Sequence, residues 1–190
     1  MAQKTGRTTS SGQIGPTDPR LLSSPLDFIA EDNMRERVIC ALLDRMVASI
    51  LPDEEDRVQV LAFLKEELPL HLADENIDLF PLMRARCTAE DEIDKVIGRM
   101  QSDHGHALTD TPELVDLLQN ELMSETGFPD SARARMAYFA THSRRHIIVE
   151  NAIILPIARV RLTRKDLSIM RLHMLERRGL DRLTEASNAE

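Results

Sequence analysis

Apolar residues recur along most of this chain at alternating spacings of three and four, the pattern of helices that bury one face. Four long segments follow it, at residues 24–49, 53–87, 88–125 and 130–162, and a shorter one covers residues 163–179. Long amphipathic helices joined by short turns favour antiparallel neighbours. The pattern therefore predicts an all-α protein, an up-down-up-down four-helix bundle with an accessory C-terminal helix.

Single residues indicate where these helices begin or bend. Thr88, which is followed by acidic residues, and Thr163 are predicted N-caps. Pro69 and Pro81 lie inside the second segment and should kink or interrupt it, because proline lacks the backbone N–H that a helix interior uses. The apolar pattern continues past Pro112, which favours a kink over a break in the third segment.

The composition supports a helical fold and limits the function. The chain has one Tyr, no Trp and seven Gly among 190 residues, and 42% of it is apolar, enough for one packed core. Its formal charge of -8 gives no reason to expect nucleic acid or an anionic membrane as a partner. Cys40 and Cys87 are too few for a disulfide scaffold or a Cys-rich zinc site.

The polarity of the chain ends suggests a division into three parts. Residues 1–23 are rich in Ser, Thr, Gly and Pro, which predicts a disordered tail. Residues 24–162 form the predicted bundle, and residues 163–190 form the accessory helix and a tail. No apolar run approaches the ~20 residues that span a bilayer, and the N-terminus shows no apolar signal segment. We therefore expect a cytoplasmic protein.

Polar residues interrupt the apolar row of each long helix. In chain order they are Asn33, Glu36, His71, Glu75, His104, His146 and Glu150. At 1.5 Å per residue, members from all four helices lie roughly 12–22 Å from the same end of an up-down-up-down bundle. They should converge on one layer, which is costly unless its members are paired or bound to something.

An internal repeat marks the same residues independently. The motif HxxxEN, followed by four residues and Pro, occurs at residues 71–81 and again at residues 146–156. Asp103-His104 precedes the second copy as Asp32-Asn33 precedes the first, by 42 and 38 residues to the respective motif histidines. Asn33 therefore occupies the position that His104 holds in the second half.

The repeated residues are typical of a metal site. His and Glu four residues apart project from one helix face, so each pair can bind one metal ion or two adjacent ones. Two facing pairs and His104 offer three imidazoles and two carboxylates, a mixture suited to iron, manganese or zinc. A buried ion-pair layer that ties the bundle together is the alternative interpretation.

The segments DFIAEDN, HLADENIDLFPLM, DHGHA and HIIVENAIILPIA, within residues 25–162, resemble the hemerythrin-like HHE cation-binding family. The resemblance implies a four-helix bundle with a non-haem, usually di-iron, centre in which both Glu side chains bridge. The implied metal ligands are His71, Glu75, His104, His146 and Glu150. Because Asn33 replaces the family's helix 1 histidine, the implied cofactor is a di-iron centre or an incomplete one, with manganese or zinc as alternatives to iron.

Three further residues allow more than one interpretation. Asn33 is either a weak ligand or water holder, or a hydrogen-bonding filler. Glu36, one turn on, could supply the missing ligand or pair with an arginine. His142 is in a row with His146, so it could replace the absent histidine, lie behind the ligands, or face solvent.

The resemblance also implies a class of function. It implies a protein that binds or senses a small diatomic ligand such as oxygen or nitric oxide, or a related oxidant, or that handles iron. The alternative is a regulatory or protein-interaction bundle with a degenerate metal site, whose tail and last helix contact a partner. No substrate pocket or placed acid or base is indicated, so an enzyme such as an oxidase is the less favoured hypothesis.

Overall fold

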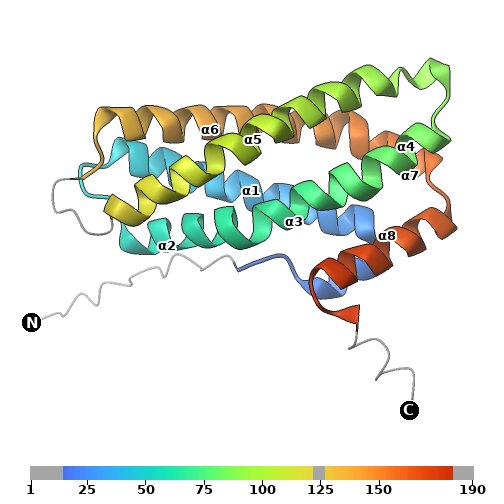
Figure 1. Ribbon diagram of the computed structural model, residues 1–190, viewed down its shortest axis with the longest axis horizontal. Coiled ribbons are helices and arrows are strands. Elements are labelled where there is room, and N and C mark those ends of the chain that lie inside the picture. The colour runs from blue at the N-terminus through green and yellow to red at the C-terminus, as the bar shows by residue number, and fades with distance from the viewer. Residues whose placement is uncertain (1–14, 122–126, 182–190) are drawn as a thin grey trace, which may run out of the picture.

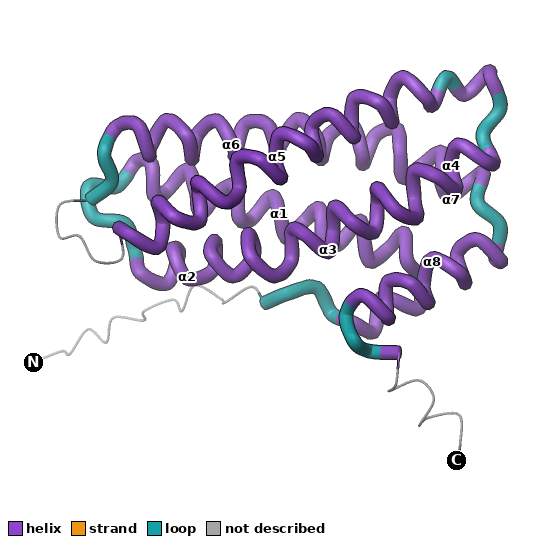
Figure 2. Tube along the Cα trace, viewed as in Figure 1, coloured by secondary structure: helices purple, strands orange, loops and turns teal. Residues whose placement is uncertain are grey.

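The computed structural model describes residues 15–121 and 127–181. Four long helices run up-down-up-down, and a shorter helix packs beside them (Figure 1). The first and third long helices are α1 (Pro25–Ala48) and α5 (Ile93–Glu121). The second consists of α2 (Glu54–Ala62), η2 (Phe63–Glu67), α3 (Leu68–Ala73), η3 (Asp74–Leu79) and α4 (Phe80–Arg86). The fourth consists of α6 (Asp130–Val149), η5 (Glu150–Ile154) and α7 (Leu155–Arg161), and the accessory helix is α8 (Arg164–Arg177). The described residues contain helices and loops only (Figure 2), which confirms the predicted all-α fold.

Prolines inside the second and fourth long helices coincide with π-helical turns. The segments η2, η3 and η5 end two residues before Pro69, Pro81 and Pro156, respectively. Proline normally clashes with the carbonyl four residues before it, and in each case that carbonyl falls within the wider π turn. The long helices therefore continue past these prolines, with a π turn instead of a break. The third long helix, α5, also runs without interruption through Pro112.

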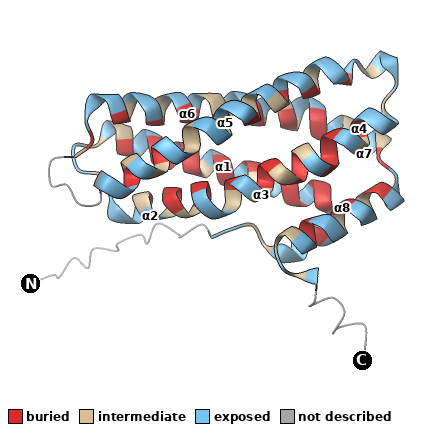
Figure 3. Ribbon diagram, in the orientation of Figure 1, coloured by how far each residue is buried: buried red, intermediate tan, exposed pale blue. Residues whose placement is uncertain are grey.

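Apolar side chains form two buried clusters at different levels of the bundle. One contains Leu43 and Met136, and the other contains Phe80 and Ile97. Along each long helix, the polar interruptions predicted from the sequence fall at the transition from one cluster to the other. Buried positions run along the inward faces of all four helices (Figure 3). The polar layer is therefore enclosed by apolar packing above and below.

The boundary of the predicted N-terminal tail is wrong. Within the predicted tail of residues 1–23, Pro19–Ser23 form a 3-10 helix, η1, and Leu22 is 1% exposed in a core cluster shared with Met170 of α8. Leu22 packs in a cluster that includes residues of α8, far away in the sequence, so the local composition of a Pro- and Ser-rich segment could not reveal its burial. Residues 1–14 of the predicted tail lie outside the described residues.

The predicted start of the third helix is also wrong. Thr88 caps a 3-10 turn, Ala89–Asp91, through a reciprocal capping box with Asp91. Glu92 then adopts a left-handed conformation with φ of 47°, and α5 begins at Ile93. Left-handed backbone cannot continue a right-handed helix, so the cap and the long helix are separate. The predicted extension over residues 122–125 lies outside the described residues.

The accessory helix begins as the sequence predicts. Thr163 forms a capping box with Asp166, and the helix is followed by Gly179 with φ of +66°. On the bundle side, Asp74 and Asp78 of η3 accept hydrogen bonds from Arg177. The accessory helix is thus fixed to the π turn of the second long helix.

None of the described helices is long and apolar enough to cross a bilayer.

Candidate metal centre

The structure brings the five ligands implied by the sequence into one buried layer. They are His71 in α3, Glu75 in η3, His104 in α5, His146 in α6 and Glu150 in η5. Each is at most 7% exposed, and both glutamates are fully buried. Three of the four long helices contribute these ligands, and the remaining one, α1, contributes Asn33, which is also fully buried.

Glu75, His104 and His146 form one compact set of ligand atoms, here called the His104 group. His104 Nε2 lies 2.9 Å from Glu75 Oε2 and 3.1 Å from His146 Nε2. His146 Nε2 lies 3.8 Å from the same Glu75 oxygen. Ligand atoms bound at roughly 2.0–2.2 Å to one ion lie about 3–3.5 Å apart, so these three atoms need only small shifts to share a metal.

His71, Glu75 and Glu150 form a second set, here called the His71 group. His71 Nε2 is 3.7 Å from Glu75 Oε1, whereas the other oxygen of Glu75 faces the His104 group. Glu150 Oε2 is 4.0 Å from His146 Nε2, so this carboxylate also lies near both groups. Glu75 is therefore placed to bridge two ions, one in each group.

Several nitrogen and oxygen atoms that could bind a metal are buried in this layer without a hydrogen bond. They are both ring nitrogens of His71, all four carboxylate oxygens of Glu75 and Glu150, and Asn33 Oδ1. A buried polar atom without a partner costs about 1–3 kcal/mol, and more when it is charged. So many unsatisfied atoms directed into one layer fit a metal centre far better than a purely structural ion-pair layer.

Two asparagines behind the layer repeat the same contact. Asn76 Oδ1 lies 3.0 Å from His104 Nδ1, and Asn33 Nδ2 donates to Asn151 Oδ1 at 3.3 Å. Asn76 and Asn151 are the N of the two HxxxEN motifs. A hydrogen bond at His104 Nδ1 leaves Nε2 free to bind metal, which is how such outer contacts orient histidine ligands. The repetition of these asparagines in the two motifs is the sequence signal for this role, which the spacing of the ligands alone does not predict.

Two aspartates form a matching outer contact with the motif histidines. Asp32 Oδ2 is 3.6 Å from His71 Nδ1, and Asp103 Oδ2 is 3.8 Å from His146 Nδ1. Both aspartates directly precede the Asn33 and His104 positions in the sequence repeat. Carboxylates at this location raise the basicity of metal-bound imidazoles. The two halves of the chain thus contribute equivalent outer carboxylates as well as equivalent HxxxE pairs of candidate ligands.

The charges in the layer shift the pKa values of its members in different directions. Burial alone would lower the pKa of His71, but Glu75, Asp32 and Glu150 outweigh it and raise that pKa well above its usual value. Burial would raise the pKa of Glu75, but mainly the charge of His71 holds it well below the usual range. Burial and the charge of Glu75 raise the pKa of Glu150 well above the usual range. A metal ion would displace protons from this centre as it binds.

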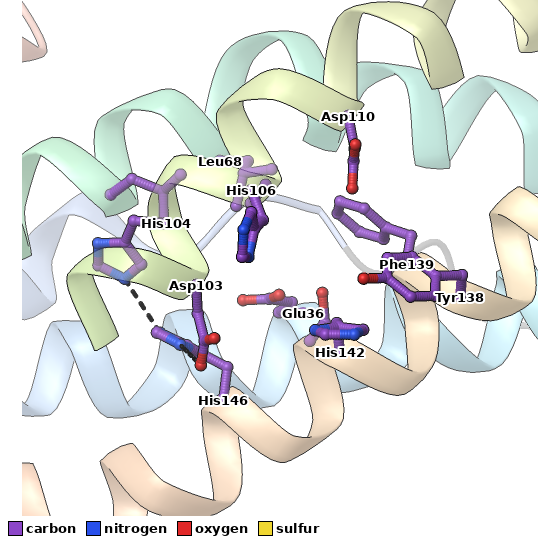
Figure 4. A pocket seen from close by; sticks show the side chains of 13 residues that line it. Glu36, Leu68, Asp103, His104, His106, Asp110, Tyr138, Phe139, His142 and His146 are labelled. Atoms are coloured by element: carbon purple, nitrogen blue, oxygen red, sulfur yellow. Dashed lines mark hydrogen bonds and ion pairs between the residues drawn. The ribbon is translucent and has the colours of Figure 1, made fainter. Parts of the chain in front are cut away.

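Glu36 and His142 belong to neither ligand group among the described residues. Both line a pocket of about 40 Å³ that also reaches His104 and His146. In Figure 4, Glu36 lies among His106, His142 and His146. The arginine partner considered for Glu36 in the sequence analysis is not found within residues 15–121 and 127–181.

Comparison with known proteins places this architecture in a family. A search of curated proteins and a search of solved structures gave no match. The family profile described as hemerythrin HHE cation binding domain matches residues 24–158, which include Asn33 and all five candidate ligands. The matched span covers the four-helix bundle and ends before α8. The chain therefore belongs to the hemerythrin HHE cation-binding domain family.

Proposed function

We propose that this protein is a non-haem iron protein that binds up to two ions in the buried layer and responds to a small oxidant or diatomic molecule. The observation that carries the proposal is the pair of ligand groups that share Glu75. The ring nitrogens of His71 and the carboxylate oxygens of Glu75 and Glu150 support it further, because they are buried without a hydrogen bond and a bound cation would interact with them.

The ligand types favour iron, manganese or zinc over calcium and magnesium, and we propose iron. A mixture of imidazole and carboxylate ligands suits iron, with manganese and zinc as competitors. It does not suit calcium or magnesium, which prefer oxygen ligands only. The His104 group would provide two imidazoles and the His71 group one, so the two positions would differ in affinity. When bound, iron would supply redox chemistry and an open coordination position.

The pocket beside His104 and His146 supports a small ligand. Its volume of about 40 Å³ exceeds the roughly 10–15 Å³ that holds one water, so it can admit a diatomic molecule but no large substrate. Oxygen, nitric oxide or a related oxidant would fit this space, and iron handling is the related role that needs no such ligand. We propose a cytoplasmic setting for this activity.

Metal analysis of the full chain, purified and reconstituted under anaerobic conditions, tests the proposal. We expect bound iron, visible charge-transfer bands that change on exposure to oxygen or nitric oxide, and a melting temperature well above that of the chelated protein. The last effect arises because only the folded bundle assembles the ligands. A chain that takes up no metal after reconstitution would contradict the proposal and would favour a regulatory bundle with a degenerate site.

A further inference from the structure

A metal ion needs a path into this centre, because the candidate ligands of the centre are buried. His71 and His104 are 2% exposed, and Glu75 and Glu150 are fully buried. The pocket described above reaches the His104 group from the space between α5 and α6. We call this pocket the entry pocket. Besides His104 and His146, its polar lining includes Glu36, Asp103, His106, Asp110, Tyr138 and His142.

Two facing rows of side chains lead from the ligands toward the surface. On α5, Asp103, His106 and Asp110 follow at spacings of three and four, so they share one helix face over about 10 Å. On α6, His142 and Tyr138 continue the row from His146 at spacings of four. Exposure of the side chain rises from 2% at His104 to 53% at Tyr138. The pocket is therefore lined by a buried candidate ligand and by an exposed residue.

The outer end of this route opens into a wider groove. Asp110, Tyr138 and Phe139 line both the entry pocket and a neighbouring groove of about 400 Å³. Arg135 lines the groove, but its guanidinium is paired with Glu113. A different groove, beside Asp32, reaches none of the five ligands.

The lining of the entry pocket suits a cation. Glu36, Asp103 and Asp110 contribute three carboxylates, and neither Lys nor Arg lines the pocket. Glu36 is 4% exposed and has neither a hydrogen bond nor an ion pair within the described part of the chain. A carboxylate buried without a partner is expensive, and a passing cation would stabilise it. Glu36 lies one helical turn from Asn33, so it places a carboxylate of α1 near the metal layer on the side of the entry pocket.

We infer that the entry pocket is the route by which ferrous iron reaches the buried centre, with Asp110 at its outer part and Glu36 at its inner part. The inference rests on the proposed function, since it concerns the loading of the same centre. Glu36 acts here as a transient cation site on the way to the ligands, and a lined path of negative charge raises the entry rate by concentrating and guiding the ion.

Loading kinetics of the metal-free full chain test this route. The wild-type protein and the variants Glu36→Gln and Asp110→Asn are mixed anaerobically with ferrous iron, and uptake is followed by the loss of signal from a ferrous indicator dye. Asp116→Asn is the matched control, because Asp116 is an exposed carboxylate on α5 that does not line the pocket. We expect uptake to slow about tenfold in Glu36→Gln and about threefold in Asp110→Asn, with the control unchanged.

The amount of iron bound at the end distinguishes a route from a ligand. All four proteins should reach the same iron content once loaded. A Glu36→Gln variant that loads as fast as the wild type would overturn the route, and one that ends with less iron would overturn it by making Glu36 a ligand. A wild-type chain that takes up no iron would instead refute the proposed function, and the route with it.

Discussion

Replacement of Asn33 by His tests whether the two halves of the centre are equivalent. In the second half, His104 Nδ1 lies 3.0 Å from Asn76 Oδ1. This contact directs the opposite ring nitrogen, Nε2, toward Glu75 and His146. In the first half, Asn151 Oδ1 already accepts a hydrogen bond from Asn33 at 3.3 Å. An imidazole at position 33 would find the same acceptor for its Nδ1–H. The substitution Asn33→His should therefore add a sixth ligand at the His71 group.

The size of the effect can be bounded from the contacts. Loss of an outer hydrogen bond to a ligand changes metal affinity by about 10–100-fold, so a direct ligand should add at least tenfold, or about 1.4 kcal/mol, at the His71 group. Asn33 is fully buried, so the larger side chain should cost about 1–3 kcal/mol in the metal-free protein. Without metal, the variant should melt at a lower temperature than the wild type. Iron should raise the melting temperature of the variant by more than it raises that of the wild type.

Iron counting after identical anaerobic reconstitution is the deciding assay. We expect fewer than two ions per wild-type chain, or a second ion held weakly, and a value approaching two in Asn33→His. The control is the double variant Asn33→His with Asn151→Ala, which removes the acceptor that orients the new imidazole and should lose much of the gain. A wild type that is already saturated at two ions would refute the idea of a vacant position beside His71.

Three further predictions concern the ligands and the accessory helix. Glu75→Ala should abolish binding at both positions, because Glu75 directs one oxygen to each group, whereas His104→Ala should mainly affect one position; unchanged iron content in both variants would disprove the ligand assignment. Arg178→Ala removes one of the two arginines that pair with the fully buried Asp74, and Arg177 stays paired with it, so urea titration of the metal-free chain should show a loss of about 2 kcal/mol, against a negligible loss if α8 docks without this pair. Asp166→Asn should cost about 1–2 kcal/mol at neutral pH, because Asp166 caps α8 and an arginine of α4 holds its pKa well below the usual range. A carboxyl with a lowered folded-state pKa stabilises the fold above its unfolded-state pKa and loses that contribution as the pH falls, so the deficit of Asp166→Asn should shrink below about pH 4; a deficit independent of pH would count against this assignment.

The helices and the chemistry of the centre are local properties of the sequence. The three-and-four spacing of apolar residues predicts the long helices because helical periodicity is set by neighbouring residues. The repeated HxxxEN motif, with Asn33 and His104 at matching positions, points to the candidate ligands without any knowledge of packing. The prolines of the motif carry a further signal, since Pro81 and Pro156 each follow a π turn that contains a glutamate of the layer.

Contacts between distant segments decided the rest. The division of Glu75 between two ligand groups depends on how three helices meet, and one helix alone cannot specify it. Leu22 is buried in a cluster to which α1 and α8 both contribute, so a segment with the composition of a tail becomes part of the core. That Glu36 forms no ion pair with any arginine among the described residues is likewise a result of tertiary packing, and no local pattern reports it. Local periodicity thus determined which faces are buried, and only tertiary packing determined which side chains on those faces meet, because side-chain partners are set by the relative placement of whole helices.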